Sequence, residues 1–199
     1  MKQTSRVSRW EALTTALSLS LVAGLSLSAR SAAAQQAPSS AKILVAYFSR
    51  TGNTRVIAGQ IRRAYDADLF EIQPADPYPE DYEAVVSQAQ RERDAGYQPP
   101  LGATIPNIRS YDVIFLGFPI WGMTTPPVIR SFLSDHDLSG KTLIPFVTHG
   151  GYGRGESMTV VAEHAPRSRL LEGFTMQADQ ERETLSQVTR WLGGIPIRK

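Results

Sequence analysis

The sequence predicts an α/β protein with a three-layer, doubly wound architecture around a five-stranded parallel sheet. Three short, continuous apolar runs are typical of strands that are buried on both faces: Ile43–Phe48, Asp112–Phe118 and Lys141–Thr148. Segments with helical spacing separate them, and strand and helix alternate five times between residues 42 and 192. Such alternation favours one parallel sheet covered by helices on both faces.

The first elements follow from the spacing of their apolar residues. A helix is predicted over about Thr54–Tyr65, and the alternating segment Asp68–Ile72 indicates a strand nearer the sheet edge. Pro77 and Pro79 mark a loop. The helix predicted over Asp81–Ala95 is polar on most of its faces.

The second half of the chain continues the alternation, with two prolines suited to the start of a helix. The predicted elements between and after the apolar runs are a connection over Gly96–Ser110, a helix from Pro126 and Pro127, a short helix over Ser157–His164, a last strand over Leu170–Met176 and a closing helix over Asp179–Leu192.

The first 34 residues have the pattern of a signal peptide. Lys2, Arg6 and Arg9 precede an uncharged stretch, residues 12–29, and Ala32–Ala34 supplies small residues for cleavage after Ala34. A permanent anchor helix is the alternative, but Ser and Thr interrupt the apolar run. We therefore expect an exported protein, periplasmic or secreted, that meets the membrane only through this segment if it is uncleaved.

Removing the signal peptide changes the charge of the chain. Residues 1–34 hold four basic residues and one acidic residue. The linker 35–41 and the domain 42–199 then hold 17 basic and 18 acidic residues, a formal net charge of −1, against +2 for the whole chain. This balance argues against a nucleic-acid partner. With no Cys, redox chemistry needs a bound cofactor, and no His, Asp or Glu spacing resembles a metal site.

Polar residues directly after the first buried strand predict a phosphate site. The unpaired N–H groups at a helix start and the helix dipole favour an anion, and glycine lets the backbone approach it closely. The loop lacks the Lys of a nucleoside-triphosphate loop and does not read G-x-G-x-x-G. An ordinary capping turn is the alternative interpretation. The candidate residues are Ser49, Arg50, Thr51, Gly52, Asn53 and Thr54.

The loops after the other two buried strands hold aromatic and glycine residues. Trp121 offers a flat face for a ring, although a core Trp is the commoner use of that residue. Closely spaced glycines suggest backbone groups placed against a ligand, and Tyr152 could supply a second aromatic face. His149 is more often a hydrogen-bonding surface residue than a proton donor. The candidates are Pro119, Ile120, Trp121, Gly122, Thr148, His149, Gly150, Gly151, Tyr152 and Gly153.

At these three loops the sequence resembles the flavodoxin family. S-R-T-G-N-T is similar to the phosphate loop of that family, and F-P-I-W-G and T-H-G-G-Y-G are similar to its two ring-enclosing loops. Tyr78–Tyr82 is similar to a P-Y-P-x-D-Y segment of one branch. The resemblance implies the strand order 2-1-3-4-5 and flavin mononucleotide (FMN) as cofactor, with its phosphate on the first loop, Trp121 on one ring face, and Arg50 and Arg154 offsetting negative charge nearby.

The expected function is therefore that of an exported, FMN-binding redox protein that transfers electrons through the flavin and needs no catalytic side chain. Its partner would be a redox protein or a small electron acceptor. Two alternatives stay open: an FMN-dependent NAD(P)H:quinone-type reductase, and a binding module that keeps the fold without redox activity. The near-neutral charge of the mature chain argues against a strongly acidic mobile carrier.

Overall fold

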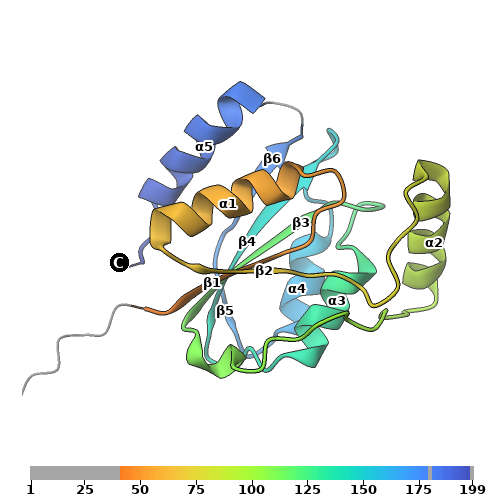
Figure 1. The fold of residues 1–199 in the computed structure, drawn as a ribbon, viewed down its shortest axis with the longest axis horizontal. Helices are drawn as coiled ribbons and strands as arrows, with labels where there is room; N and C mark the ends of the chain where they lie inside the picture. Colours follow the sequence, from red (N-terminus) through yellow and green to blue (C-terminus); the bar gives the residue numbers. More distant parts are fainter. Residues whose placement is uncertain (1–40, 179–180, 198–199) are drawn as a thin grey trace, which may run out of the picture. The chain divides into compact units, whose positions relative to one another are not determined.

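The computed structural model describes residues 41–178 and 181–197. The predicted signal peptide and its cleavage site lie outside the described residues. Within them, all strands run parallel in the order β2-β1-β3-β4-β5, with a further short strand, β6, beside β4 (Figure 1). This confirms the predicted fold class. The strands are β1 (Ile43–Tyr47), β2 (Asp68–Glu71), β3 (Val113–Pro119), β4 (Thr142–His149), β5 (Arg169–Leu170) and β6 (Phe174–Gln177).

The last strand position differs from the single strand predicted over Leu170–Met176. Two short pieces fill it, because β5 and β6 both pair with β4 while their registers differ by one residue. Pro145 lies at the break and supplies no N–H to the ladder. A Cβ atom on Gly173 would lie 2.9 Å from the carbonyl carbon of Pro145, so only glycine fits this bulge.

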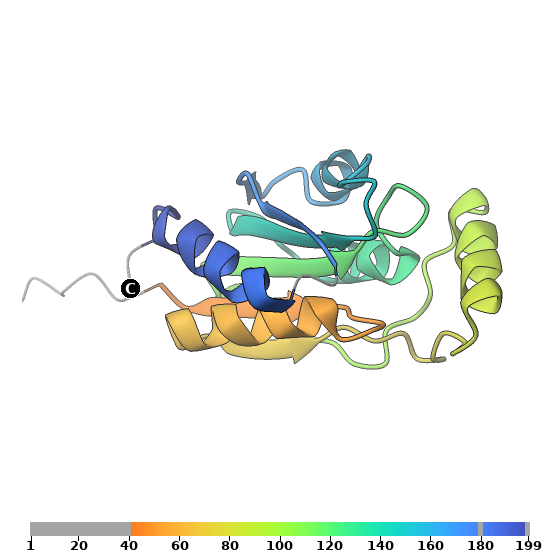
Figure 2. The ribbon, with the colours of Figure 1, turned by 90° about the horizontal axis from the view of Figure 1, so that it is seen from above.

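Four helices cover the two faces of the sheet (Figures 1 and 2). On one face lie α1 (Asn53–Tyr65) and α5 (Glu181–Gly193), and on the other lie α3 (Pro127–Asp135) and α4 (Ser157–His164). Each pair has its own apolar core. Strand residues alternate between the two cores: Leu44 and Ala46 face α3 and α4, whereas Val45 and Tyr47 face α1 and α5.

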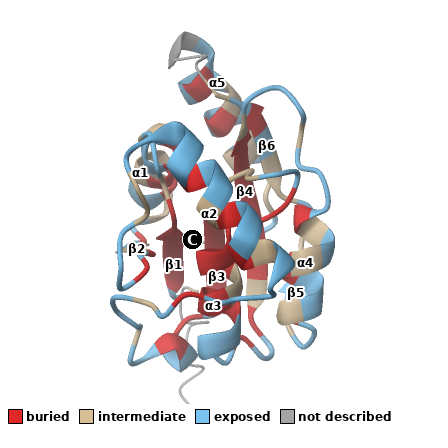
Figure 3. Ribbon diagram, turned by 90° about the vertical axis from the view of Figure 1, so that its right-hand side faces the viewer, coloured by how far each residue is buried: buried red, intermediate tan, exposed pale blue. Residues whose placement is uncertain are grey.

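The remaining helix, α2 (Tyr82–Asp94), does not cover a face of the sheet. Figure 2 shows it standing beyond the carboxyl ends of the strands, and Figure 3 shows it exposed along most of its length. The connection before the short helix η1 (Ile108–Ser110) packs on the sheet instead, through Leu101 and Ile105. The weak apolar face of α2 explains this placement, because it offers little surface to bury.

Helix ends agree with the prediction to within one or two residues. Asp81 caps α2 by accepting a hydrogen bond of 2.8 Å from the N–H of Ala84. Pro127 is the first residue of α3, as its fixed φ favours. Searched over residues 41–178 and 181–197, the structure holds no helix long and apolar enough to cross a membrane.

Candidate functional site

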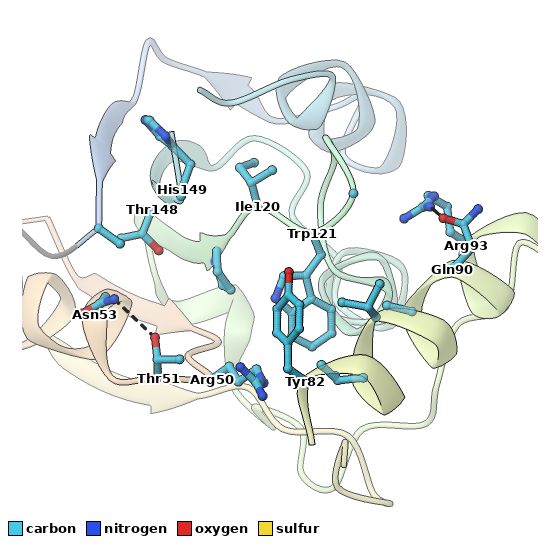
Figure 4. A pocket seen from close by; sticks show the side chains of 17 residues that line it. Arg50, Thr51, Asn53, Tyr82, Gln90, Arg93, Ile120, Trp121, Thr148 and His149 are labelled. Carbon is cyan, nitrogen blue, oxygen red and sulfur yellow. Dashed lines mark hydrogen bonds between the residues drawn. The ribbon is translucent and has the colours of Figure 1, made fainter. Parts of the chain in front are cut away.

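A cavity of about 320 Å³ opens at the carboxyl edge of the sheet, between the three predicted loops and α2 (Figure 4). This is the edge at which open parallel sheets bind ligands. Its volume is sufficient for one cofactor-sized ligand. The side chains and backbone that line it belong to Arg50, Thr51, Asn53, Tyr82, Val85, Val86, Ala89, Gln90, Arg93, Pro119, Ile120, Trp121, Gly122, Thr148, His149, Gly150 and Ala178.

The loop between β1 and α1 is organised by Ser49 and Gly52. The Ser49 hydroxyl accepts hydrogen bonds from the N–H groups of Gly52 (3.2 Å) and Arg55 (3.3 Å). Gly52 has a φ of 95°, which a residue with a Cβ atom rarely adopts, although no atom would obstruct that Cβ. The glycine is therefore needed for its backbone angle, and the loop is a tight turn that ends at the start of α1.

Several backbone N–H groups at this turn have no partner among the described residues. Among the described residues, the N–H groups of Asn53 and Thr54 make no hydrogen bond, and they stand at the first turn of α1. Thr51 and Asn53 line the cavity, and the Asn53 amide donates to the Thr51 hydroxyl over 3.3 Å. Unpaired amides, hydroxyls and the positive end of a helix dipole form a site for an anion.

Thr54 joins this turn to the end of β4. Its side chain is buried, and its hydroxyl lies 2.9 Å from the hydroxyl of Thr148, which is also buried. The Thr54 side chain therefore holds two loops together. The backbone N–H of Thr54 stays available to a ligand.

The Arg50 side chain turns away from the α1 turn. Its guanidinium donates to the backbone carbonyl of Glu80 over 2.8 Å and lies 5.8 Å from the centre of the Tyr82 ring. It thereby ties the β1–α1 loop to the start of α2.

The loop after β3 is a two-residue turn. Trp121 and Thr124 exchange backbone hydrogen bonds of 3.0 and 3.2 Å, and both central residues have positive φ, 56° at Gly122 and 67° at Met123. These angles define a type I′ turn, in which the non-glycine residue Met123 is strained.

Trp121 is half-buried and packs edge-on against two other aromatic side chains. Its ring centre lies 5.2 Å from that of Phe48 and 4.9 Å from that of Tyr78. The edge-on contacts fix the indole plane, since such pairs prefer this arrangement. Trp121 therefore presents a rigid aromatic wall to the cavity.

His149 shapes the glycine-rich loop after β4. Its Nδ1 accepts hydrogen bonds from the N–H groups of Gly151 (3.0 Å) and Gly153 (3.2 Å). An accepting Nδ1 carries no proton, so the neutral ring has its proton on Nε2. His149 therefore acts as a hydrogen-bond acceptor that holds its own loop in shape.

The second and third loops are locked together at their far ends. The Met123 carbonyl accepts a hydrogen bond of 2.9 Å from the Glu156 N–H. A Cβ atom on Gly155 would lie 2.7 Å from the Met123 carbonyl carbon, which leaves no room for a side chain. The close approach of the two backbones thus depends on Gly155.

The wall formed by α2 was not predicted from the sequence. Tyr82, Val85, Val86, Ala89, Gln90 and Arg93 line the cavity from this helix. Val85, Ala89 and Glu92 are buried at positions i, i+4 and i+7, a short helical stripe that was the available sequence signal.

Buried Glu92 accepts hydrogen bonds from the Tyr78 hydroxyl (2.9 Å) and the Gln88 amide (2.8 Å). Burial, and then the hydrogen bond to Glu92, raise the pKa of Tyr78.

The predicted site residues fall into two groups. Ten of them line the cavity: Arg50, Thr51, Asn53, Pro119, Ile120, Trp121, Gly122, Thr148, His149 and Gly150. The others do not line it: Ser49, Gly52, Thr54, Gly151, Tyr152 and Gly153. Tyr152 is 83% exposed, and Tyr82 is the second aromatic residue at the cavity in its place. In the part of the chain that is described, no cluster of His, Cys, Asp and Glu could hold a metal ion.

Comparison with known proteins gives the following matches. The flavodoxin family model matches residues 42–194. A protein from Bacteroides eggerthii assigned as a flavoprotein is 36% identical, with a TM-score of 0.69, over 79% of this chain and 99% of its own. One from Bacteroides uniformis, also assigned as a flavoprotein, is 30% identical, with a TM-score of 0.69, over 77% and 99%.

A more distant match shares the fold. The flavoprotein of Lactobacillus acidophilus, solved in complex with FMN, is 20% identical with a TM-score of 0.62, over 74% of this chain and 99% of its own. No curated protein matches the chain.

Proposed function

The chain belongs to the flavodoxin family, and on this premise we propose that it is an exported redox protein that transfers electrons through a bound FMN. The observation that carries the proposal is the turn at the start of α1. The unpaired N–H groups of Asn53 and Thr54 and the hydroxyl of Thr51 form a cradle for a phosphate, in a turn that the Ser49 hydroxyl holds in shape.

The rest of the cavity fits the other end of FMN. Trp121 offers a planar wall whose orientation is fixed by Phe48 and Tyr78. Gly150 and the backbone near Gly122 bring main-chain groups to the same space. One cavity thus joins an anion site to an aromatic wall, which is the chemistry of a flavin nucleotide.

Bound FMN supplies the electron chemistry, because its ring accepts and releases one or two electrons. The residues of this chain bind and orient it. Pro119, Ile120, Val85 and Val86 give the space beside Trp121 an apolar lining. No acidic or basic side chain is required as a proton donor, since electron transfer needs none.

The phosphate assignment is tested by the double variant Thr51→Ala with Asn53→Ala. It removes the two polar side chains that line the cavity at this turn, and we expect FMN affinity to fall about 30- to 100-fold while riboflavin affinity changes little. Fluorescence titration of both ligands measures this. The matched control is Thr104→Ala with Asn107→Ala, two exposed residues away from the cavity. Equal FMN affinity in the two double variants would contradict the assignment.

A second function, that of an FMN-dependent NAD(P)H reductase, is favoured by the position of α2. The helix stands over the carboxyl edge of the sheet (Figure 3). Its side chains add a wall to the cavity, an arrangement that suits a small substrate better than a large protein partner. Anaerobic mixing with NADH or NADPH separates the two functions. Rapid bleaching of the flavin supports the reductase, and no bleaching supports the carrier.

Export is supported by the signal-peptide pattern of residues 1–34. Mass measurement of the protein recovered outside the cytoplasm should give a chain that begins at Gln35. A protein that stays in the cytoplasm with Met1 retained would overturn this part of the proposal.

A further inference from the structure

Arg93, on the last turn of α2, places its guanidinium at the loop after β3. It lines the cavity, and a Cβ atom on Gly122 would lie 2.9 Å from Arg93 Cζ. The guanidinium therefore packs directly on the backbone of the Trp121–Thr124 turn. It does so because Gly122 has no side chain to hold it away.

The charge of Arg93 is not neutralised by a carboxylate in the described structure. The guanidinium donates to the side-chain carbonyl of Gln90 and takes part in none of the ion pairs found there. No Asp or Glu is among the described residues that line the cavity, where Arg50 is the other arginine. Since Arg50 is bonded to the Glu80 carbonyl, Arg93 is the cation at the Gly122 end.

Arg93 and the phosphate cradle lie at opposite ends of the cavity. Figure 4 shows Thr51 and Asn53 on one side and Arg93 with Gln90 on the other, with Trp121 and Tyr82 between them. A ligand with its phosphate on the cradle and its ring beside Trp121 would direct the far part of that ring toward Arg93.

We propose that Arg93 stabilises the negative charge that reduction places on the flavin ring, and so raises the reduction potential of the bound FMN. The inference rests on the proposed function. With the phosphate on the cradle, the part of the ligand that faces Arg93 is the flavin ring.

The charge balance is simple. Two electrons from an external reductant such as dithionite, together with one proton from water, give the oxidised ring one net negative charge. A half-buried cation beside the ring favours that form over the neutral oxidised ring. Arg93 therefore acts on the balance between the two redox forms more than on FMN binding as such.

The test compares Arg93→Gln with Arg91→Gln. Arg91 lies on the same helix with the same charge, but it is exposed and does not line the cavity. Arg93→Gln should weaken binding of reduced relative to oxidised FMN about tenfold, a fall in the two-electron midpoint potential of about 30 mV. Arg91→Gln should change the affinity for reduced relative to oxidised FMN less than twofold. Arg93→Lys, which keeps the positive charge, should keep most of the wild-type preference for reduced FMN.

The outcomes separate the two proposals. If wild type and variants bind FMN and Arg93→Gln shifts the potential no more than Arg91→Gln, the role of Arg93 is overturned while the proposed function stands. If wild type binds no FMN, both fall. Affinity for oxidised FMN should change less than threefold in Arg93→Gln, and a larger loss with no shift in potential would also overturn the inference, because it would show a purely structural role.

Discussion

The two ends of the cavity are built in different ways. The phosphate end is a turn of six consecutive residues, 49–54, shaped by hydrogen bonds between near neighbours in the sequence. The α2 end joins residues that lie far apart in the sequence, such as Tyr78, Arg93 and Trp121. The first end is a property of the local backbone on the rigid sheet. The second end depends on a helix held by a few side chains. Substitutions there can therefore change the affinity for FMN and the potential of the bound flavin without loss of the fold.

The largest loss of stability should come from Gly155→Ala, which acts on the contact between the loops after β3 and β4. Its Cβ atom would collide with the Met123 backbone, and Gly155 has a φ of 49°. We expect a loss of about 2–4 kcal/mol in the free energy of unfolding, measured by urea denaturation. Gly150→Ala is the matched control, because open space surrounds that glycine, and it should cost less than about 1 kcal/mol. Similar losses in both variants would contradict the close approach of the two loops.

Tyr78→Phe should have a smaller effect, confined mainly to α2. It removes the donor to buried Glu92, and an unsatisfied buried acceptor costs about 1–3 kcal/mol. Hydrogen exchange should show faster exchange in α2 than in α1. Tyr82→Phe is the control, since Tyr82 is 63% exposed. Uniformly faster exchange across the domain would show that α2 is not a separate unit.

The same tyrosine predicts a pH dependence. The pKa of Tyr78 is raised from its ordinary value of 10.0 by burial and by Glu92. Its contribution to stability is therefore complete below pH 10, where the unfolded residue is also neutral, and decreases as the pH rises toward the folded pKa. The stability of the wild type should fall more steeply above pH 10 than that of Tyr78→Phe. Parallel curves would exclude this origin.

Asp81→Ala should give the smallest effect, about 1 kcal/mol, because one capping bond to the Ala84 N–H is lost. Circular dichroism melts measure it. Asp76→Ala, an exposed acidic residue outside the helices, is the charge-matched control and should be neutral. The cap assignment would be wrong if both variants melted alike.

The sequence predicted the local features well. The three buried strands and the turn at Gly52 follow from patterns within a few residues. The sequence could not predict where each polar side chain points. The Thr54 hydroxyl, for example, bonds the hydroxyl of Thr148, 94 positions away. Nothing in the turn itself indicates that partner.

The position of α2 could not be predicted, for a physical reason. A helix with a weak apolar face has no strong preference for a face of the sheet, and the segment with Leu101 and Ile105 covers that surface instead. Apart from the short stripe of Val85, Ala89 and Glu92, the sequence therefore carries no signal that α2 lines the cavity. Pro145, within the buried strand β4, was a sequence signal for the break in the last strand position. The break itself lies in the neighbouring strand, between β5 and β6, and so it was not predicted.

If this cavity holds FMN by its phosphate and ring together, titration of the purified apoprotein with FMN and with riboflavin will distinguish the two flavins. We predict saturable quenching of flavin fluorescence at one FMN per chain, with FMN bound about 100-fold more tightly than riboflavin because only FMN reaches the N–H groups of Asn53 and Thr54. No quenching, or equal affinity for the two flavins, would contradict it.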